Sequence, residues 1–281
     1  MRDFHMPSAL SRRNFLKSSA AAAAAASLPL TSLPALAAPE SAKQPAAESV
    51  VKLLYESMTD KQKQQVCFDW DYTEKKRGLL RTRIQNNWKI TKPDIKSEFY
   101  TADQQQMIRD IFKGMTNPEW LDRWDQQLRD DVGGFGRRQS IAIFGEPGSG
   151  KFEFVLASRH MTLRCDGDSA DHVAFGGPIL YAHEGQALYE KPHHPGNVFW
   201  HQALEATELY NTLDGKQQRQ ALVVTGMPTE HDVGFRGPKG EFQGLPVSDM
   251  SRDQAENLQR ILKLMLEPFR QSDQDEVAKC L

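Results

Sequence analysis

Residues 54–62 read LYESMTDKQ, and residues 209–217 read LYNTLDGKQ. Each stretch ends in a capping box, in which a Thr or Asp and the Gln three residues later bond the unpaired N–H groups at the start of a helix. Two further boxes, at 101–104 and 251–254, open long helices with apolar faces. The same order thus occurs twice with an offset of about 150 residues, which indicates a tandem duplication.

The first copy continues into segments that read as strands. A Gly-rich break at 133–136 precedes two apolar runs, 140–144 and 152–165, which are joined by the glycine-containing turn 145–150. We expect the second run to be one continuous strand. Alternation along it then places Phe154, Leu156, Ser158, His160, Thr162 and Arg164 on one face and an apolar set on the other.

The second copy reaches Leu281 without a matching hairpin. We therefore expect a C-terminally shortened version of a longer protein, the alternative being a natural end. The predicted fold class is α+β, with helical pairs packed on antiparallel β-hairpins. It consists of two related halves, about 49–175 and 176–281, of which the second is incomplete.

The N-terminal segment is predicted to be an export signal and no part of the fold. Residues 11–17 read SRRNFLK, which matches the twin-arginine pattern through Arg12 and Arg13. An apolar segment and a small-residue cleavage site follow. We expect a signal peptide over 1–37, a linker over 38–48 and the α+β domain over 49–281.

This signal predicts the protein's partners and location. The apolar segment is shorter than the roughly 20 strongly apolar residues of a membrane helix, so no stable membrane anchor is expected. The expected partners are the twin-arginine translocation machinery and signal peptidase. The predicted location is periplasmic or secreted, after export in the folded state.

Charge and cysteine content exclude some classes of protein. The 281 residues carry a formal net charge of -2 and no long basic run, so a nucleic-acid partner is not expected. The three cysteines, Cys67, Cys165 and Cys280, form no C-x-x-C motif. In an oxidising compartment Cys67 and Cys165 could pair, or they could be two buried thiols.

Residues 145–151, GEPGSGK, resemble a phosphate-binding P-loop. Phe152 stands where the Mg²⁺-binding Ser or Thr should be, and the residues after it alternate like a strand, whereas a P-loop leads into a helix. We therefore predict a turn between antiparallel strands and no nucleotide cofactor.

Histidines and carboxylates after residue 158 are the candidates for chemistry. The polar end of the predicted strand indicates a cleft, or simply a strand that emerges into solvent. Imidazole and carboxylate together suit zinc, copper or iron, although histidines in solvent-exposed loops are the alternative. The predicted metal ligands are His160, His183, His194 and Asp166. The predicted catalytic residues are Glu184 and Arg164, the latter to orient an anionic or carbonyl-bearing substrate.

Three aromatic or helical segments have simpler interpretations. Trp120 and Trp124 are expected in the core. The helix from Asn197 is expected to bury Phe199, Ala203, Ala206, Tyr210 and Leu213, which leaves His201 facing water. The extended run 86–93, which is polar and aromatic, is typical of a functional connection.

Several segments, taken in order, resemble a known family. They are Ile141–Pro147, Arg159–Leu163, Gly177–Pro178, Leu213–Gln217 and Gly244–Pro246 followed by Ser251–Gln254. Together they resemble bacterial exported proteins catalogued as family number 3500 among the domains of unknown function. Members commonly show a His-His-Leu-Ser-Leu-Asn-like strand, and here Arg159 replaces the first His and Arg164 the Asn. Members also tend to continue into a further hairpin and a His-x-His segment. The resemblance implies no established activity.

Taken together, the residues favour an exported metal-dependent periplasmic enzyme. The alternative is a non-enzymatic periplasmic protein that binds a ligand or interacts with the cell envelope, with a polar cleft and no metal.

Overall fold

A computed structural model describes residues 46–148, 151–167, 173–183, 194, 196–223 and 240–280. All the described elements lie in one compact unit, Pro45–Leu281. Its helices are α2 (Ala47–Ser57), α3 (Asp60–Val66), α4 (Ala102–Met115), α5 (Leu121–Val132), α6 (Trp200–Thr212), α7 (Gly215–Ala221), α8 (Arg252–Leu266) and α9 (Gln271–Cys280). Single 3-10 turns are η1 (Leu80–Thr82), η2 (Pro118–Trp120), η3 (Ala174–Gly176) and η5 (Val247–Asp249).

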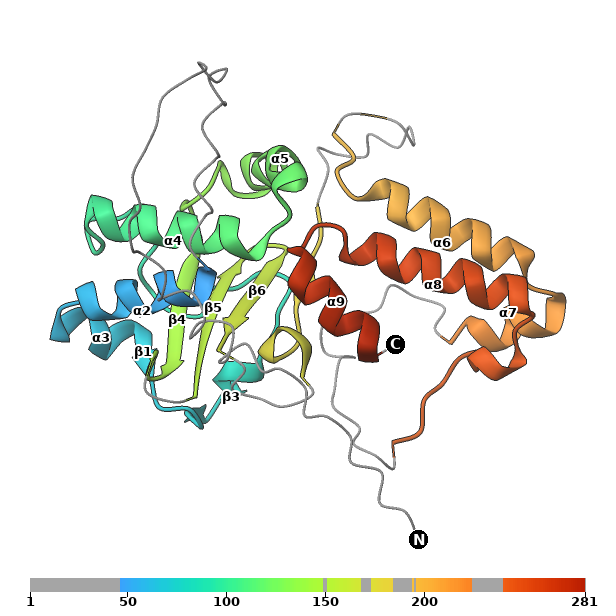
Figure 1. Ribbon diagram of the computed structural model, residues 1–281, viewed down its shortest axis with the longest axis horizontal. Helices are drawn as coiled ribbons and strands as arrows, with labels where there is room; N and C mark the ends of the chain where they lie inside the picture. The colour runs from blue at the N-terminus through green and yellow to red at the C-terminus, as the bar shows by residue number, and fades with distance from the viewer. Residues whose placement is uncertain are drawn as a thin grey trace, which may run out of the picture. The chain divides into compact units, whose positions relative to one another are not determined.

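The main sheet runs in the order β1-β4-β5-β6-β7 (Figure 1). Its strands are β1 (Cys67–Phe68), β4 (Ser140–Gly145), β5 (Phe152–Ser158), β6 (Met161–Asp166) and β7 (Leu180–Tyr181). β1 pairs parallel to β4, and the other neighbours pair antiparallel. A small hairpin of β2 (Thr73–Glu74) and β3 (Gly78–Leu79) stands apart. The α+β prediction is confirmed, and the parallel edge strand makes the sheet mixed.

Both faces of the sheet are buried. On one face, alternate residues such as Ile143, Phe154 and Leu163 pack with α2, α4 and α5 in the larger hydrophobic core. On the other face, Phe144 and Val155 pack against the segment from Phe68 to Ile90. This double burial explains why the strands read as almost continuous apolar runs.

The expectation of one strand over 152–165 is wrong. The chain reverses at Arg159 and His160, so that Ser158 pairs with Met161 across the turn. His160 has a φ of 56°, in the left-handed region that tight turns require. The reversal changes which residues share a face of the sheet. Leu156 pairs with Leu163 in the larger core, whereas Arg164 pairs with Val155 on the opposite face.

The segment between β4 and β5 is a hairpin connection, as predicted for the P-loop look-alike. Gly145 and Phe152 are paired in the antiparallel ladder. Gly145 has a φ of 70°, and a Cβ atom there would lie 2.1 Å from the carbonyl oxygen of Lys151. The glycine is therefore required by the turn itself.

The repeated helical pattern is present in the structure. All four capping boxes form, at the starts of α3, α4, α7 and α8. Their glutamines also bond one another in pairs: Gln62 Nε2 donates to Gln104 Oε1 at 2.8 Å, and Gln217 Nε2 donates to Gln254 Oε1 at 3.1 Å.

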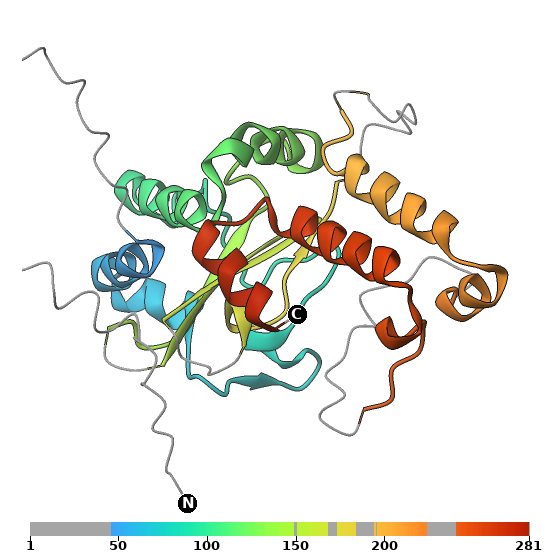
Figure 2. The same ribbon diagram turned by 45° about the vertical axis from the view of Figure 1, so that its right-hand side comes forward.

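The glutamine pairs match in their other bonds too. In the first group, Gln104 donates to the carbonyl oxygen of Ser57, two residues before the Thr59 cap. In the second, Gln254 donates to the carbonyl oxygen of Thr212, two residues before the Asp214 cap. α2 packs on α4, and α6 packs on α8, as Figures 1 and 2 show. The group of α2, α3 and α4 and the group of α6, α7 and α8 therefore share the same helical arrangement.

The first helical group, which is α2, α3 and α4, meets the second, which is α6, α7 and α8, where α4 and α8 end. Thr116 and Phe269 form an isolated antiparallel bridge. The amide of Asn117 donates to the carbonyl oxygen of Pro268 at 3.0 Å, and the Trp124 indole donates to the same oxygen at 3.2 Å. Trp124 is fully buried, as predicted, and Trp120 is 5% exposed. Matching ends of the two groups thus contact each other.

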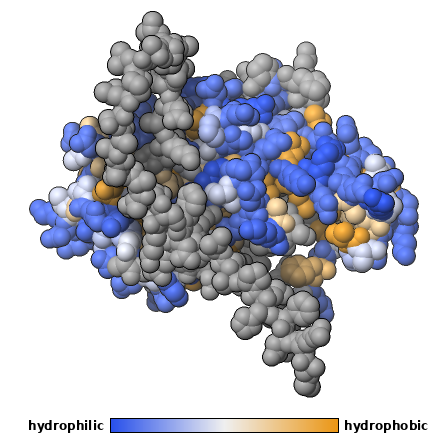
Figure 3. Space-filling model, viewed as in Figure 1, coloured by the Kyte–Doolittle hydropathy of each residue, from blue (hydrophilic) through white to orange (hydrophobic). Residues whose placement is uncertain are grey.

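The prediction for the helix after Asn197 is partly wrong. α6 begins at Trp200, and its buried residues are Gln202 and Leu209, whereas Ala203 and Ala206 are exposed. Gln202 is buried because its amide bonds Tyr181 and the carbonyl oxygen of Leu264. Figure 3 shows apolar side chains in orange on the surface near this helical group.

Cys67 and Cys165 are free thiols. Cys67, Ile143, Phe154 and Cys165 are successive partners across β1, β4, β5 and β6. Three strand spacings separate the two cysteines by roughly 14 Å, well beyond the reach of a disulfide. Burial raises the pKa of Cys67 to about 12 and raises that of Cys165 as well. The geometry favours buried thiols over a disulfide.

Candidate functional site

Two neighbouring aspartates in the last turn of α5 organise the candidate site. Asp130 and Asp131 precede Gly133, whose φ of 80° ends the helix. Carboxylates are disfavoured here because the C-terminal end of a helix carries partial negative charge. Gln127 donates from Nε2 to Asp131 Oδ2 at 2.7 Å, one helical turn away. Asp131 is only 6% exposed.

His160 contacts Asp131 from the turn between β5 and β6. Its Nδ1 lies 2.9 Å from Asp131 Oδ2, and its side chain is 11% exposed. Its backbone is fixed as well, because its amide donates to the carbonyl oxygen of Asn86 and its carbonyl oxygen accepts from Ala182. Histidine is among the residues that adopt positive φ most readily, so it suits this turn.

His183 contacts the other aspartate. It follows β7, and its Nε2 lies 3.1 Å from Asp130 Oδ2. The bond between Ala182 and His160 brings the two histidines to the same end of the hairpin. Each imidazole therefore has one nitrogen beside a carboxylate, and the two carboxylates are adjacent in the sequence.

This arrangement fixes which nitrogen of each ring can do chemistry. A carboxylate that accepts from one ring nitrogen orients the ring and makes the other nitrogen a better base or metal ligand. The ring nitrogens that do not contact the aspartates are Nε2 of His160 and Nδ1 of His183. Among the side chains that the structure describes, no three His, Cys, Asp or Glu residues gather closely enough to hold a metal ion by themselves.

Arg164 lies away from this pair, four residues or about 13 Å along the strand from His160. Its side chain is fully enclosed, and Nη1 donates to Glu153 Oε1 at 2.6 Å. Nε donates to the carbonyl oxygen of Pro178, and the two Nη atoms donate to those of Arg81 and Arg83. Burial lowers the pKa of Arg164 and raises that of Glu153, while each charge opposes the shift of the other. With its donors directed at protein groups, Arg164 has the geometry of a structural residue.

Of the remaining predicted residues, Asp166 lies far from the histidines. Asp166 pairs opposite Glu153 in the ladder, about 20 Å along the strand from His160. His194 accepts through Nδ1 from the amide of Gly196 within its own loop. Glu184 lies outside the described residues. The structure thus brings together His160 and His183 and separates them from Arg164 and Asp166.

Sequence reasoning missed Asp130, Asp131 and Gln127. A signal was present, because two consecutive aspartates at the C-terminal end of a helix oppose its dipole. Gln127 and Asp131 are also four residues apart, the spacing that pairs side chains on a helix. An unfavourable charge kept in the last turn indicates a partner from elsewhere in the fold.

Comparison with known proteins identifies a family but no characterised relative. The sequence profile described as "Protein of unknown function (DUF3500)" matches residues 40–280. The profile of the twin-arginine translocation pathway signal sequence matches residues 9–29. No curated protein and no solved structure matches the chain.

The signal match shows that the protein is exported in the folded state through the twin-arginine pathway, to the periplasm or the exterior. Within the described part of the chain, no helix combines the length and the apolar character needed to cross a membrane.

Proposed function

The chain belongs to the DUF3500 family of proteins of unknown function, and we propose that this exported member is a metal-dependent enzyme whose His160 and His183 are imidazole ligands of a divalent transition metal. One observation carries the proposal: adjacent carboxylates, Asp130 and Asp131, each hold one nitrogen of a different imidazole. Zinc, copper and iron all accept imidazole nitrogen.

The residues at this site meet some of the requirements of a bound metal ion. Metal-bound histidines usually donate their second N–H to a carboxylate, which is the arrangement at His160 and Asp131. Two imidazoles do not complete a catalytic centre, which typically has three protein ligands. Glu184, adjacent to His183, is the proposed further ligand or acid–base group.

A bound metal would supply a Lewis acid and lower the pKa of a water molecule. The chain's own residues have separate tasks. Asp131 holds the His160 ring in the tautomer that leaves Nε2 unprotonated, and Gln127 holds Asp131 in place. Export in the folded state is compatible with loading of the metal before translocation.

Elemental analysis of protein exported by its native signal tests the proposal. We expect close to one equivalent of metal in the natural protein and a large loss in His160→Ala and Asp131→Asn. His201→Ala is the matched control, because His201 packs on Trp120 at a ring distance of 5.7 Å and contacts neither aspartate.

Less than about a tenth of an equivalent, unchanged by His160→Ala, would contradict the proposal and favour a ligand-binding protein without metal.

A further inference from the structure

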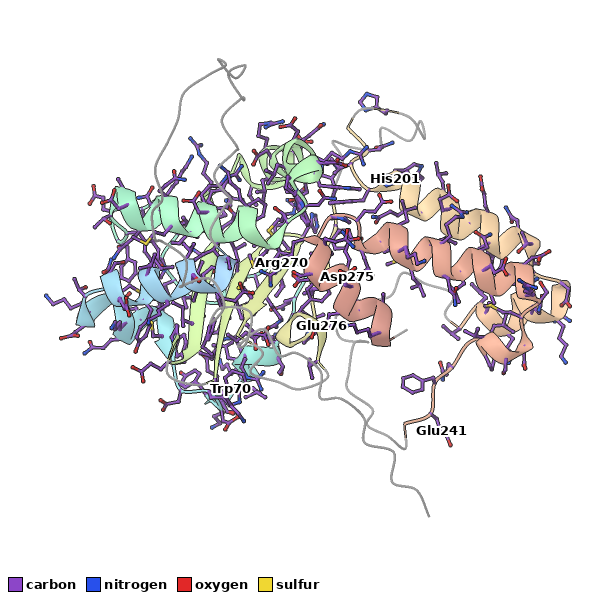
Figure 4. All side chains as sticks on the ribbon, in the orientation of Figure 1. Trp70, His201, Glu241, Arg270, Asp275 and Glu276 are labelled. Atoms are coloured by element: carbon purple, nitrogen blue, oxygen red, sulfur yellow. The ribbon has the colours of Figure 1, made fainter. Side chains whose placement is uncertain are left out.

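A cleft of ≈ 600 Å³, whose lining includes neither His160 nor His183, lies between the end of α3, the β2–β3 hairpin and the extended segment after Trp88. It is lined by Gln65, Phe68, Glu74, Arg77, Lys89, Ile90, Thr91, Lys92 and Pro93. Its volume is within the range of small-molecule sites. Figure 4 labels Trp70, which lies beside the hairpin that borders the cleft.

The charge of this lining is positive. Three of its side chains are cationic and only Glu74 is acidic, in a chain whose formal net charge is -2. Lys75 and Lys76, both exposed, add positive charge in the turn of the same hairpin. Charges gathered in a cleft attract ligands of the opposite sign more strongly than the same charges spread over a surface.

The walls are held in place before any ligand arrives. Arg77 forms a two-pronged ion pair with Glu74, at 2.5 and 2.6 Å. The same guanidinium donates through Nη1 to the carbonyl oxygen of Ile90 at 3.0 Å, which ties the hairpin to the extended segment. Thr91 is 7% exposed and donates to the carbonyl oxygen of Ile141 in the sheet.

The cations differ in how far they are already engaged. Arg77 is committed to Glu74 and the backbone, and Lys89 Nζ lies 2.8 Å from Asp94. Lys92 is exposed and forms no ion pair with any residue that the structure describes. It is the cation most available to a ligand.

Part of the lining is apolar. Phe68 is half-buried, and its ring stacks on Phe144 at a centroid distance of 5.5 Å. Ile90 and Pro93 stand on the same lining. A ligand that fits both kinds of surface carries a negative charge and a ring or other apolar part.

We propose that this cleft binds a small organic acid, in which a ring packs against Phe68 and Pro93 and a carboxylate or other anionic group is held by Lys92 and Lys89. The site is separate from the histidine pair and does not depend on a metal. Because the protein is exported, such an acid is met outside the cytoplasm, either free or as the acidic end group of an envelope polymer.

Saturation-transfer NMR and calorimetry on the mature protein test this with matched probes. The acids are D-glucuronate and benzoate, and their neutral counterparts are D-glucose and benzyl alcohol. We expect each acid to bind about tenfold more tightly than its neutral partner, the effect of one hydrogen bond to a charged group. A short oligosaccharide of glucuronate, tested beside the monomer, distinguishes a free acid from a polymer end.

Variants locate the binding. Lys92→Gln and Lys89→Gln are expected to remove most of the preference for the acids, whereas Lys216→Gln, an exposed lysine in α7, leaves it unchanged. Equal binding of acids and neutral probes, equal loss with Lys216→Gln, or displacement of the acids by an equal concentration of sulfate would overturn the proposal.

Discussion

Arg164 and His160 are both polar residues of one hairpin, yet their surroundings differ. Arg164 is enclosed and donates to one carboxylate and three backbone carbonyl groups. His160 has one ring nitrogen beside Asp131 and a side chain that is 11% exposed. The sequence could not show that their surroundings differ, because both were expected on the same face of one strand.

Replacing Arg164 by Met should destabilise the fold strongly. It removes the main partner of the Glu153 side chain, which has no exposed surface. We expect the free energy of unfolding in urea to fall by about 3–5 kcal/mol. The double variant Arg164→Met, Glu153→Leu should recover much of this loss, since it also removes the buried Glu153 carboxylate that would otherwise lack its main partner. A single variant within about 0.5 kcal/mol of the natural protein would contradict the structural role.

His201 predicts a dependence of stability on pH. Burial, and then the charge of Arg123, lower its pKa below the ordinary value of 6.5. The folded state therefore holds this proton less well than the unfolded state. The stability that the neutral ring contributes is present above about pH 6.5 and is lost as the pH falls through the folded pKa.

Thermal unfolding at about pH 7.5 and about pH 5.5 measures this effect. The drop in Tm between the two values should be smaller in His201→Gln than in the natural protein. An identical drop in both would show that His201 does not contribute. The expectation that this ring faces water is modified by its contact with Trp120.

At the scale of elements, capping boxes were predictable because their bonds join residues three apart in the sequence. The turn at Arg159 and His160 was not, since it lacks the Asn-Gly or Asp-Gly pair typical of tight hairpins. The polar residues Ser158 to His160 do mark the reversal, but with Thr162 and Arg164 they read equally well as the polar face of one continuous strand. The parallel pairing of β1 with β4 joins residues more than 70 apart and leaves no local signal.

The two glutamine pairs make a prediction about the helical units. Gln104 is 2% exposed and caps α4 while it bonds the carbonyl oxygen of Ser57. Gln254 makes the equivalent bonds in a less buried setting. We expect Gln104→Ala to lower the free energy of unfolding by about 2 kcal/mol and Gln254→Ala to lower it by about 1 kcal/mol or less.

Chemical denaturation of both variants checks this order. The isosteric Gln104→Glu is a useful control, because it keeps the acceptor of the capping box but removes the amide that donates to Ser57. If the two alanine variants lose equal free energy of unfolding, the greater burial of Gln104 does not determine its contribution.

In the whole molecule, the second helical group is tied to the first by a partly buried ion cluster. Arg270, labelled at the start of α9 in Figure 4, donates through Nη2 to Glu48 of α2 at 2.6 Å and through Nε to Asp273. Arg270 and Glu48 are 222 residues apart. A contact of this range depends on the assembled fold and cannot be inferred from spacing.

Arg270→Met should loosen this connection. We expect the free energy of unfolding to fall by about 3 kcal/mol, with faster hydrogen exchange in α9 and at the start of α2. Arg260→Met is the matched control, because Arg260 pairs with Glu205 on the exposed surface, where ion pairs contribute little. Unchanged exchange in α9 would contradict the connecting role.

The contacts between histidines and aspartates in the candidate site also could not be predicted from the sequence alone. His160 and His183 could be chosen from composition, but Asp131 and Asp130 are 29 and 53 residues away from them. Only the packing of α5 against the end of the hairpin brings each aspartate to its imidazole.

Imidazole ¹⁵N NMR during a Zn²⁺ titration tests whether His160 and His183 bind one metal ion together, because it reports each ring nitrogen separately. Before metal, His160 should be protonated on Nδ1 and His183 on Nε2 when neutral, as their aspartate partners require. On addition of one equivalent, the signals of His160 Nε2 and His183 Nδ1 should shift together while His201 stays unchanged. If His160 shows the opposite tautomer, or neither ring responds to Zn²⁺, the proposed metal site is contradicted.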